Sequence, residues 1–182
     1  EINRCISCTF CFETLVSDAI PDKNPVKCAV NPRAGREHHY PNYPQDGNGR
    51  TVVVVGAGVG GLEAARVLGE RGFHVIVLEK AGAVGGQINI ADKPPRKEKM
   101  DWIVDYELVQ LKKFDVTILV NVEATAERIA SYHPYAVILA TGATPIKPES
   151  IPGVDLENTL TFEEVLCDKK PLYKKQVTII GS

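Results

Sequence analysis

Residues 51–61 read TVVVVGAGVGG, a β-branched run that leads directly into a glycine-rich turn. Such a run is typical of a strand that is buried on both faces of a parallel sheet. Apolar residues then recur at helical spacing from Leu62 to Leu68, and Gly72 marks the end of a helix. A second apolar run, 74–79, completes a strand–helix–strand unit of about 30 residues. This stretch predicts an α/β fold with a Rossmann-like parallel sheet.

The turn contains three glycines, Gly56, Gly58 and Gly61, at the spacing of a dinucleotide-binding loop. The first permits a tight turn, the second lets the backbone approach a pyrophosphate, and the third lets helix and strand pack closely. The following helix N-terminus offers free N–H groups to phosphates. Glu79, 18 residues after Gly61, would accept hydrogen bonds from ribose hydroxyls and repel the 2′-phosphate of NADP. We predict a dinucleotide site, and the alternative is that the glycines serve only packing.

Two further loops bear on which dinucleotide is bound. Gly85-Gly86-Gln87 follows the second strand, where the pyrophosphate and ribitol of an extended ligand would pass. Ala140-Thr141-Gly142 ends a later apolar run, 135–140, at the edge where ligands bind in parallel sheets. FAD and NAD share their adenosine end, so the glycine turn alone does not distinguish them. The two further loops favour FAD and leave NAD as the alternative.

Four cysteines precede the turn, with the spacing Cys5-x2-Cys8-x2-Cys11-x16-Cys28. Three closely spaced thiolates and a distant fourth suit the separated iron corners of a [4Fe–4S] cluster. Structural zinc usually takes two separated ligand pairs, and disulfides across two residues would be strained. The spacing predicts an iron–sulfur cluster, with zinc and disulfides as the alternatives. Clustered thiols also favour a reducing compartment, and we predict the cytoplasm.

The composition divides the chain into three parts. Residues 1–48 lack a sustained period and are predicted to form an irregular, cysteine-rich cluster-binding segment with a linker. Residues 49–175 are predicted to hold an incomplete FAD-binding domain, and 176–182 the first strand of a truncated NAD(P)H-binding domain, so the chain reads as a fragment. Further elements are expected as helices at 98–113, 126–131 and 162–166 and as strands at 116–120, 135–140 and 176–180.

The overall composition is ordinary for a globular protein, with 44% hydrophobic and 24% charged residues. The net charge of −2 gives no reason to expect nucleic acid or an acidic membrane surface as a partner. No apolar run reaches the roughly 18–20 residues that a membrane span needs. We therefore predict neither a nucleic-acid partner nor a membrane segment.

Five longer motifs occur together in this chain. They are Arg4-Cys5-Ile6-x-Cys8, Cys28-x-Val30-Asn31-Pro32, Val55-Gly56-Ala57-Gly58-x-x-Gly61-Leu62-Glu63-Ala64-Ala65, Gly85-Gly86-Gln87-x-Asn89-Ile90-Ala91 and Ala140-Thr141-Gly142-x-x-Pro145. In combination they resemble the C-terminal part of the iron–sulfur NADH:flavin oxidoreductases related to old yellow enzyme. That family includes 2,4-dienoyl-CoA reductase, enoate reductases and trimethylamine dehydrogenase. The Cys8-x2-Cys11 spacing is similar to the amine dehydrogenases, whereas Gln87 and the residues after it resemble the reductases.

The resemblance implies a longer protein with an N-terminal FMN barrel, a [4Fe–4S] cluster after it, and Rossmann-like domains for FAD and NAD(P)H. Reducing equivalents from NAD(P)H would pass through FAD and the cluster to the barrel, which would reduce an enoate or an enoyl- or dienoyl-CoA double bond. The partners would be the barrel and the NAD(P)H domain of the same chain, and the resemblance is compatible with a homo-oligomer. The alternatives are an ADP-binding part of an amine dehydrogenase and a zinc-stabilised nucleotide-binding module.

The resemblance also implies roles for individual residues. No side chain of this chain is expected to be catalytic, and an isolated fragment is expected to be inactive on a natural substrate. The four cysteines would ligate the cluster. The FAD site would be lined by Gly58, Gly61, Glu79, Lys80, Gly86, Gln87, Ala124 and Gly142.

Overall fold

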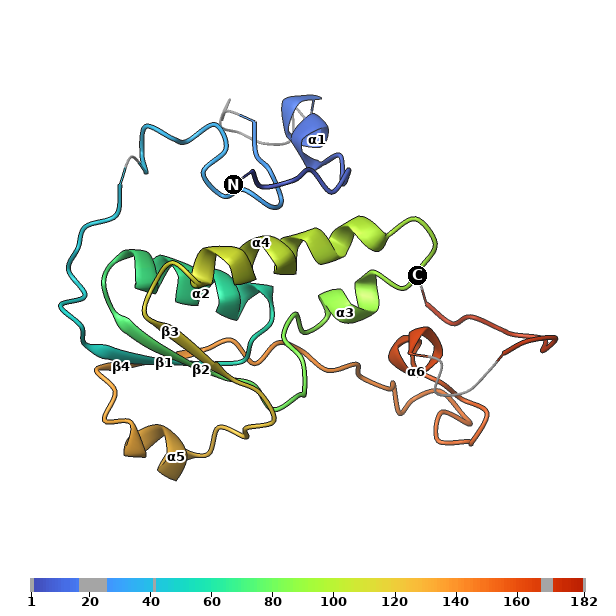
Figure 1. Cartoon of the computed structure of the whole chain (residues 1–182). Coiled ribbons are helices and arrows are strands. Elements are labelled where there is room, and N and C mark those ends of the chain that lie inside the picture. The colour runs from blue at the N-terminus through green and yellow to red at the C-terminus, as the bar shows by residue number, and fades with distance from the viewer. Residues whose placement is uncertain (1, 17–25, 41, 168–171, 182) are drawn as a thin grey trace.

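The computed structural model describes residues 2–16, 26–40, 42–167 and 172–181. At its centre lies a four-stranded sheet in the order β3-β2-β1-β4, and all three strand pairs are parallel (Figure 1). The predicted α/β fold with a parallel sheet is confirmed. The strands are β1 (Thr51–Val55), β2 (His74–Leu78), β3 (Val116–Leu119) and β4 (Ala136–Leu139).

The register brings the carboxyl ends of the strands to one edge of the sheet. Val55 lies opposite both Leu78 and Leu139, and Leu78 lies opposite Leu119. Because all four strands run in the same direction, the loops that leave them gather at this edge, where parallel sheets bind their ligands. These loops contain most of the residues predicted to bind the dinucleotide.

Both faces of the sheet carry apolar side chains, as a buried parallel strand requires. Side chains alternate along a strand, so Val52 and Val54 point to one face and Val53 to the other. The first face is covered by α2 (Val59–Glu70) and α4 (Asp101–Leu111), and the second is flanked by the short α5 (Ala126–Ser131) (Figure 1). The main core packs against α2 through Leu62, Ala65 and Leu68 and against α4 through Leu111.

The remaining helical elements are short and lie outside this layered core. The predicted helix at 98–113 is a 3-10 turn, η1 (Glu98–Met100), followed by α4. The predicted helix near 162–166 is confirmed as α6, which begins with a reciprocal capping box between Thr161 and Glu164. These elements are α1 (Phe10–Val16), α3 (Ile88–Ala91), η1 (Glu98–Met100) and α6 (Phe162–Leu166).

The predicted strand at 176–180 is wrong, because residues 176–181 have no regular secondary structure. A strand satisfies its backbone groups only by pairing with a neighbour. Within the described residues, β3 and β4 are the sheet edges and neither pairs with this segment. An apolar run without a partner strand therefore stays irregular here.

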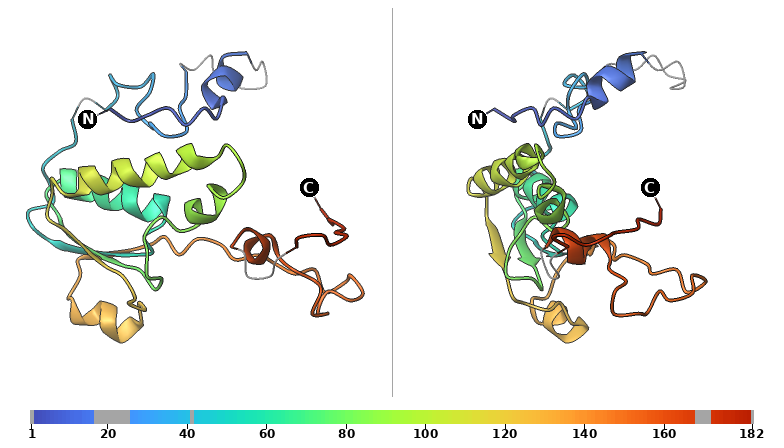
Figure 2. Two further views of the ribbon diagram at one scale, coloured as in Figure 1. Left: turned by 45° about the vertical axis from the view of Figure 1, so that its right-hand side comes forward. Right: turned by 90° about the vertical axis from the view of Figure 1, so that its right-hand side faces the viewer.

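The cysteine-bearing residues 2–16 and 26–40 lie along the side of α4 that faces away from the sheet (Figure 2). Residues 42–50 then lead into β1. Across the part of the chain that the structure describes, no helix combines the length and the apolar character needed to cross a membrane.

Candidate dinucleotide and cluster site

Two of the three turn glycines are required by the fold itself. Gly56 leaves β1 with φ +103°, and a Cβ built on it would lie 2.3 Å from the carbonyl oxygen of Ala140. A Cβ on Gly61 would lie 1.9 Å from the carbonyl oxygen of Gly56, whereas real Cβ atoms essentially never approach a neighbour within 3.0 Å. At both positions any side chain would collide with backbone, so only glycine fits.

Gly58 differs from the other two. Its φ of −70° and ψ of 176° describe extended backbone that any residue adopts. The nearest atom to a Cβ built there is the Cα of Gly86, at 4.0 Å. Neither backbone conformation nor packing requires glycine at this position. The remaining explanation for glycine at position 58 is that a ligand approaches the backbone closely. This is the role predicted for Gly58 from the motif.

Two other loops lie against the glycine turn. The N–H of Gly85 donates to the carbonyl of Ala57 at 2.8 Å, and Gly58 and Gly85 form an isolated parallel bridge. Gln87 Nε2 donates to the carbonyl of Ala143 at 2.8 Å, which joins the loop after β2 to the segment after β4. The structure thus brings together three loops that were predicted from separate motifs.

Glu79 fixes the glycine turn from the end of β2. Its side chain is buried, and Oε2 accepts from the N–H of Ala57 at 2.7 Å while Oε1 accepts from the N–H of Ala81 at 2.8 Å. Each carboxylate oxygen keeps a further lone pair that could accept from a ribose hydroxyl. The predicted ribose contact stays a prediction, and the role in holding Ala57 is one that the sequence motif did not reveal.

The other predicted lining residues lie around the same edge. Lys80 is exposed, Ala124 packs beneath β1 and β2 on the α5 side, and Ala140 is half-buried. Thr141 and Gly142 are exposed, and Gly142 has φ +73° with no atom within 4 Å of a built Cβ. Their contacts with a dinucleotide stay predictions.

The four cysteines all carry free thiols, exposed at Cys5, Cys8 and Cys11 and half-buried at Cys28. Among the residues that are described, no three His, Cys, Asp or Glu side chains are grouped so that they could hold a metal ion. The structure therefore does not gather the thiols around a common centre, and their ligation of a cluster stays a prediction.

The backbone between the cysteines has features that fit such a group. Ser7 and Thr9, on either side of Cys8, adopt φ of 59° and 61°, which is uncommon for residues other than glycine. The N–H of Ser7 donates to Cys5 Sγ at 3.4 Å. Turns of this kind present backbone N–H groups to anions and occur at many iron–sulfur sites. The donor chemistry and the loop conformation are thus both compatible with the predicted cluster.

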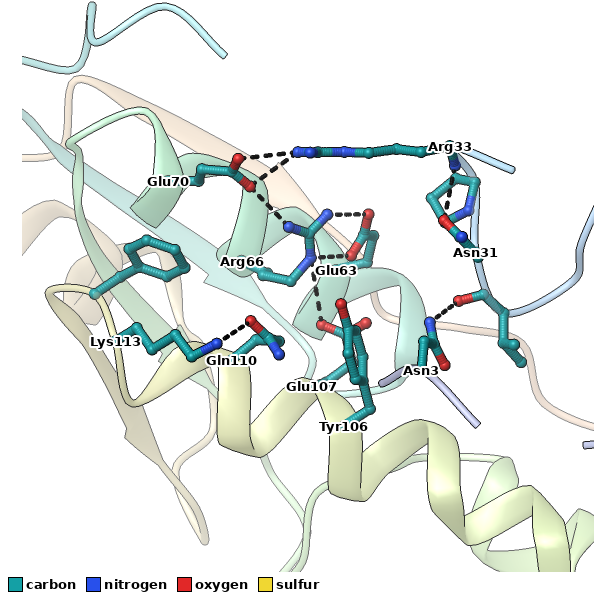
Figure 3. A pocket seen from close by; sticks show the side chains of 13 residues that line it. Asn3, Asn31, Arg33, Glu63, Arg66, Glu70, Tyr106, Glu107, Gln110 and Lys113 are labelled. Atoms are coloured by element: carbon teal, nitrogen blue, oxygen red, sulfur yellow. Dashed lines mark hydrogen bonds and ion pairs between the residues drawn. The ribbon is translucent and has the colours of Figure 1, made fainter. Parts of the chain in front are cut away.

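Sequence reasoning missed a buried charge network beside a cavity of about 420 Å³ between α2, α4 and the segment after Cys28 (Figure 3). Arg66 binds both oxygens of Glu63 at 2.6 and 2.7 Å and Glu70 at 2.9 Å. Arg33 binds both oxygens of Glu70 at 3.0 Å, which ties the cysteine-bearing segment to α2. Glu107 of α4 lies 3.8 Å from Arg66, and both side chains are buried.

Burial raises the pKa of Glu107 from 4.5 to about 7, and the neighbouring Glu63 adds to the increase while Arg66 opposes it. Between pH 4.5 and about pH 7 the Glu107 carboxyl is ionised in the unfolded chain and still protonated in the folded chain. The free energy of unfolding therefore falls as the pH rises through this window. The contribution is about 3–4 kcal/mol, since one pKa unit corresponds to about 1.4 kcal/mol.

We expect Glu107→Gln to remove this dependence, because the amide is neutral at every pH. The variant should match the wild type near pH 4.5 and exceed its free energy of unfolding by about 3 kcal/mol at pH 8. Urea unfolding at pH 4.5, 6 and 8 measures the difference. Glu123→Gln, at an exposed position, is the control and should show no such trend. A pH-independent difference for Glu107→Gln would contradict the assignment.

Comparison with known proteins gives consistent matches. Residues 50–182 match the protein family described as "Pyridine nucleotide-disulphide oxidoreductase". An NADH oxidase from Thermoanaerobacter brockii is 39% identical over 100% of this chain and 28% of its own length. A cinnamate reductase from Clostridium sporogenes is 35% identical over 100% of this chain and 26% of its own length.

A similar solved structure is that of 6-hydroxypseudooxynicotine amine oxidase from Pseudomonas geniculata N1. It has a TM-score of 0.80 and 29% sequence identity, and the match covers 92% of this chain and 26% of that chain. This chain therefore spans about a quarter of the length of the proteins that it matches. The alignments with the two curated relatives include the cysteine-bearing segment as well as the sheet.

Proposed function

Because the chain belongs to the pyridine nucleotide-disulphide oxidoreductase family, and its relatives place it in the FAD-binding part of the NADH:flavin oxidoreductases related to old yellow enzyme, we propose that it binds FAD and a [4Fe–4S] cluster and relays electrons between them. The observation that carries the FAD site is Gly58, where neither conformation nor packing requires glycine. The cluster rests on the cysteine spacing and the left-handed residues beside Cys8.

When bound, FAD accepts a hydride and can release its two electrons singly, and an iron–sulfur cluster carries single electrons. The chain's own residues would bind and orient these groups. The glycine turn and the start of α2 would hold the pyrophosphate, Glu79 would fix the turn, and the four cysteines would hold the cluster. The complete oxidoreductase would combine this part with the domains that supply the hydride and bind the substrate.

For the whole protein we propose NAD(P)H as the donor and an FMN-bearing barrel as the acceptor. The substrate class is an enoate or an enoyl- or dienoyl-CoA. The cinnamate reductase supports this proposal, because cinnamate is an α,β-unsaturated carboxylate and that enzyme aligns over the full length of this chain.

A second candidate is favoured by the similarity to the amine oxidase structure. In that case the glycine turn would hold ADP as part of an amine-oxidising enzyme. Anaerobic purification, acid extraction and mass identification of the released cofactors separate the candidates, because released FAD supports the first and released ADP without FAD supports the second. Brown protein with broad visible absorbance supports the cluster, and a colourless, zinc-replete sample would reject it.

A single substitution tests the dinucleotide site. We expect Gly58→Ala to keep its free energy of unfolding within about 0.5 kcal/mol of the wild type, because the new Cβ meets no close neighbour. Its affinity for FAD should fall by at least about tenfold, because the methyl group occupies the space through which the pyrophosphate approaches. Flavin fluorescence titration measures the affinity, and thermal unfolding without ligand measures the fold.

Gly60→Ala is the matched control. Gly60 lies in the same helical turn, and a Cβ built on it has no atom within 4 Å. Alanine there should preserve FAD binding and stabilise α2 by up to about 1 kcal/mol. If Gly58→Ala binds FAD as tightly as the wild type does, the proposed site is wrong.

A further inference from the structure

The first cysteine loop is attached to the region where η1 leads into α4. Lys99 Nζ donates to Ser7 Oγ at 3.0 Å, and Ser7 lies between Cys5 and Cys8 in the sequence. The same ammonium group lies 5.7 Å from the ring centroid of Trp102, in the first turn of α4. The lysine thus contacts the loop on one side and the helix on the other.

A second cation completes this attachment. The guanidinium of Arg4 lies 4.6 Å from the ring centroid of Trp102 and also pairs with Asp105 at 3.3 Å. Arg4 directly precedes Cys5, so the chain is held on both sides of the first cysteine. Exposed contacts of this kind are weak individually, but together they fix where the loop lies on α4.

The residue that Lys99 holds is also the one whose backbone faces a sulfur atom. Ser7 has φ of 59°, and its N–H donates to Cys5 Sγ at 3.4 Å. Hydrogen bonds to the sulfur ligands and nearby charge are two of the factors that set the reduction potential of an iron–sulfur cluster. The contact between Lys99 and Ser7 therefore affects both factors, because it holds the residue that donates to the sulfur and brings a positive charge to the loop.

We propose that Lys99 is a positioning residue that tunes the cluster: it holds the Ser7 turn and places a positive charge beside the Cys5–Cys8 loop. This inference rests on the proposed function. Reduction adds negative charge to a cluster, and a nearby cation stabilises the reduced state. Loss of Lys99 is therefore expected to lower the reduction potential. Lys97 is exposed in the adjoining turn, and among the described residues it is Lys99, not Lys97, that hydrogen-bonds to Ser7.

The experiment is an anaerobic redox titration of the protein at its natural length, with the reduced cluster followed by electron paramagnetic resonance. Lys99→Met should shift the equilibrium about fivefold toward the oxidised cluster, which is about 41 mV at 59 mV per decade. Lys99→Arg retains the charge and the donors, so it should stay within about twofold of the wild type, or about 18 mV. Lys97→Met removes an equal charge without the contact and should also stay within about twofold.

The outcomes separate this inference from the proposed function. A wild-type protein without any cluster signal overturns the proposed function, and with it the role of Lys99. A wild-type signal with an unchanged potential in Lys99→Met, or an equal shift in Lys97→Met, overturns the role of Lys99 alone. If Lys99→Met does not take up the cluster, Ser7→Ala tests the same contact, and a lowered potential is again the supporting result.

Discussion

Gly61→Ala is expected to lower the free energy of unfolding by about 3 kcal/mol or more, at the upper end of what overpacking costs. The added Cβ would lie 1.9 Å from the carbonyl oxygen and 3.0 Å from the carbonyl carbon of Gly56. Both are backbone atoms of a turn that is itself fixed, because the N–H of Gly56 donates to Leu78 at 2.8 Å. No flexible side chain can move aside, so α2 would have to shift away from β1.

Thermal unfolding followed by circular dichroism measures this loss. For a domain of this size, 3 kcal/mol corresponds to a fall in Tm of about 6–12 °C. Gly60→Ala is again the control, because it adds the same methyl group one residue earlier without meeting an atom within 4 Å. A Gly61→Ala variant within about 1 kcal/mol of the wild type would show that the helix can shift without cost, contrary to the close packing seen here.

The contrast among the three turn glycines shows what the sequence could and could not predict. The strand–helix–strand unit at 51–79 was predicted correctly because its signals are local: a β-branched run, a glycine turn and a helical repeat. The individual roles of the glycines depend on Ala140 and Gly86, which lie in distant segments. The motif assigns these roles by analogy, and only the folded chain shows which glycine packing requires.

The features that the sequence did not predict also depend on distant segments of the chain. The apolar run at 176–180 resembles a strand, but a strand depends on a neighbour that the run itself does not specify. The spacing of Glu63, Arg66 and Glu70 is that of helical ion pairs and was visible in the sequence. The burial of this arginine depends on α4, a distant part of the chain that packs against α2 and brings Glu107 to it.

Arg66→Met should be strongly destabilising, by about 3 kcal/mol at pH 8, because removing one partner leaves buried charge uncompensated. Hydrogen bonding to Glu63 raises the pKa of Arg66 above its usual value despite burial, so the guanidinium stays charged. Without it, Glu63 and Glu107 would face each other with no cation between them, and Glu70 would keep only its pair with Arg33.

The loss should depend on pH in a direction that identifies its cause. At pH 5 Glu107 is protonated even in the wild type, so Arg66→Met should cost less there than at pH 8. Adding Glu107→Gln to Arg66→Met should recover part of the loss at pH 8, since it removes one of the two facing charges. Arg128→Met, at an exposed position on α5, should change the free energy of unfolding by less than about 0.5 kcal/mol. Methionine largely preserves the packing of the aliphatic stem of Arg66, so the loss should come mainly from the missing charge. Equal losses at both pH values would contradict the role of the ionised Glu107 carboxylate.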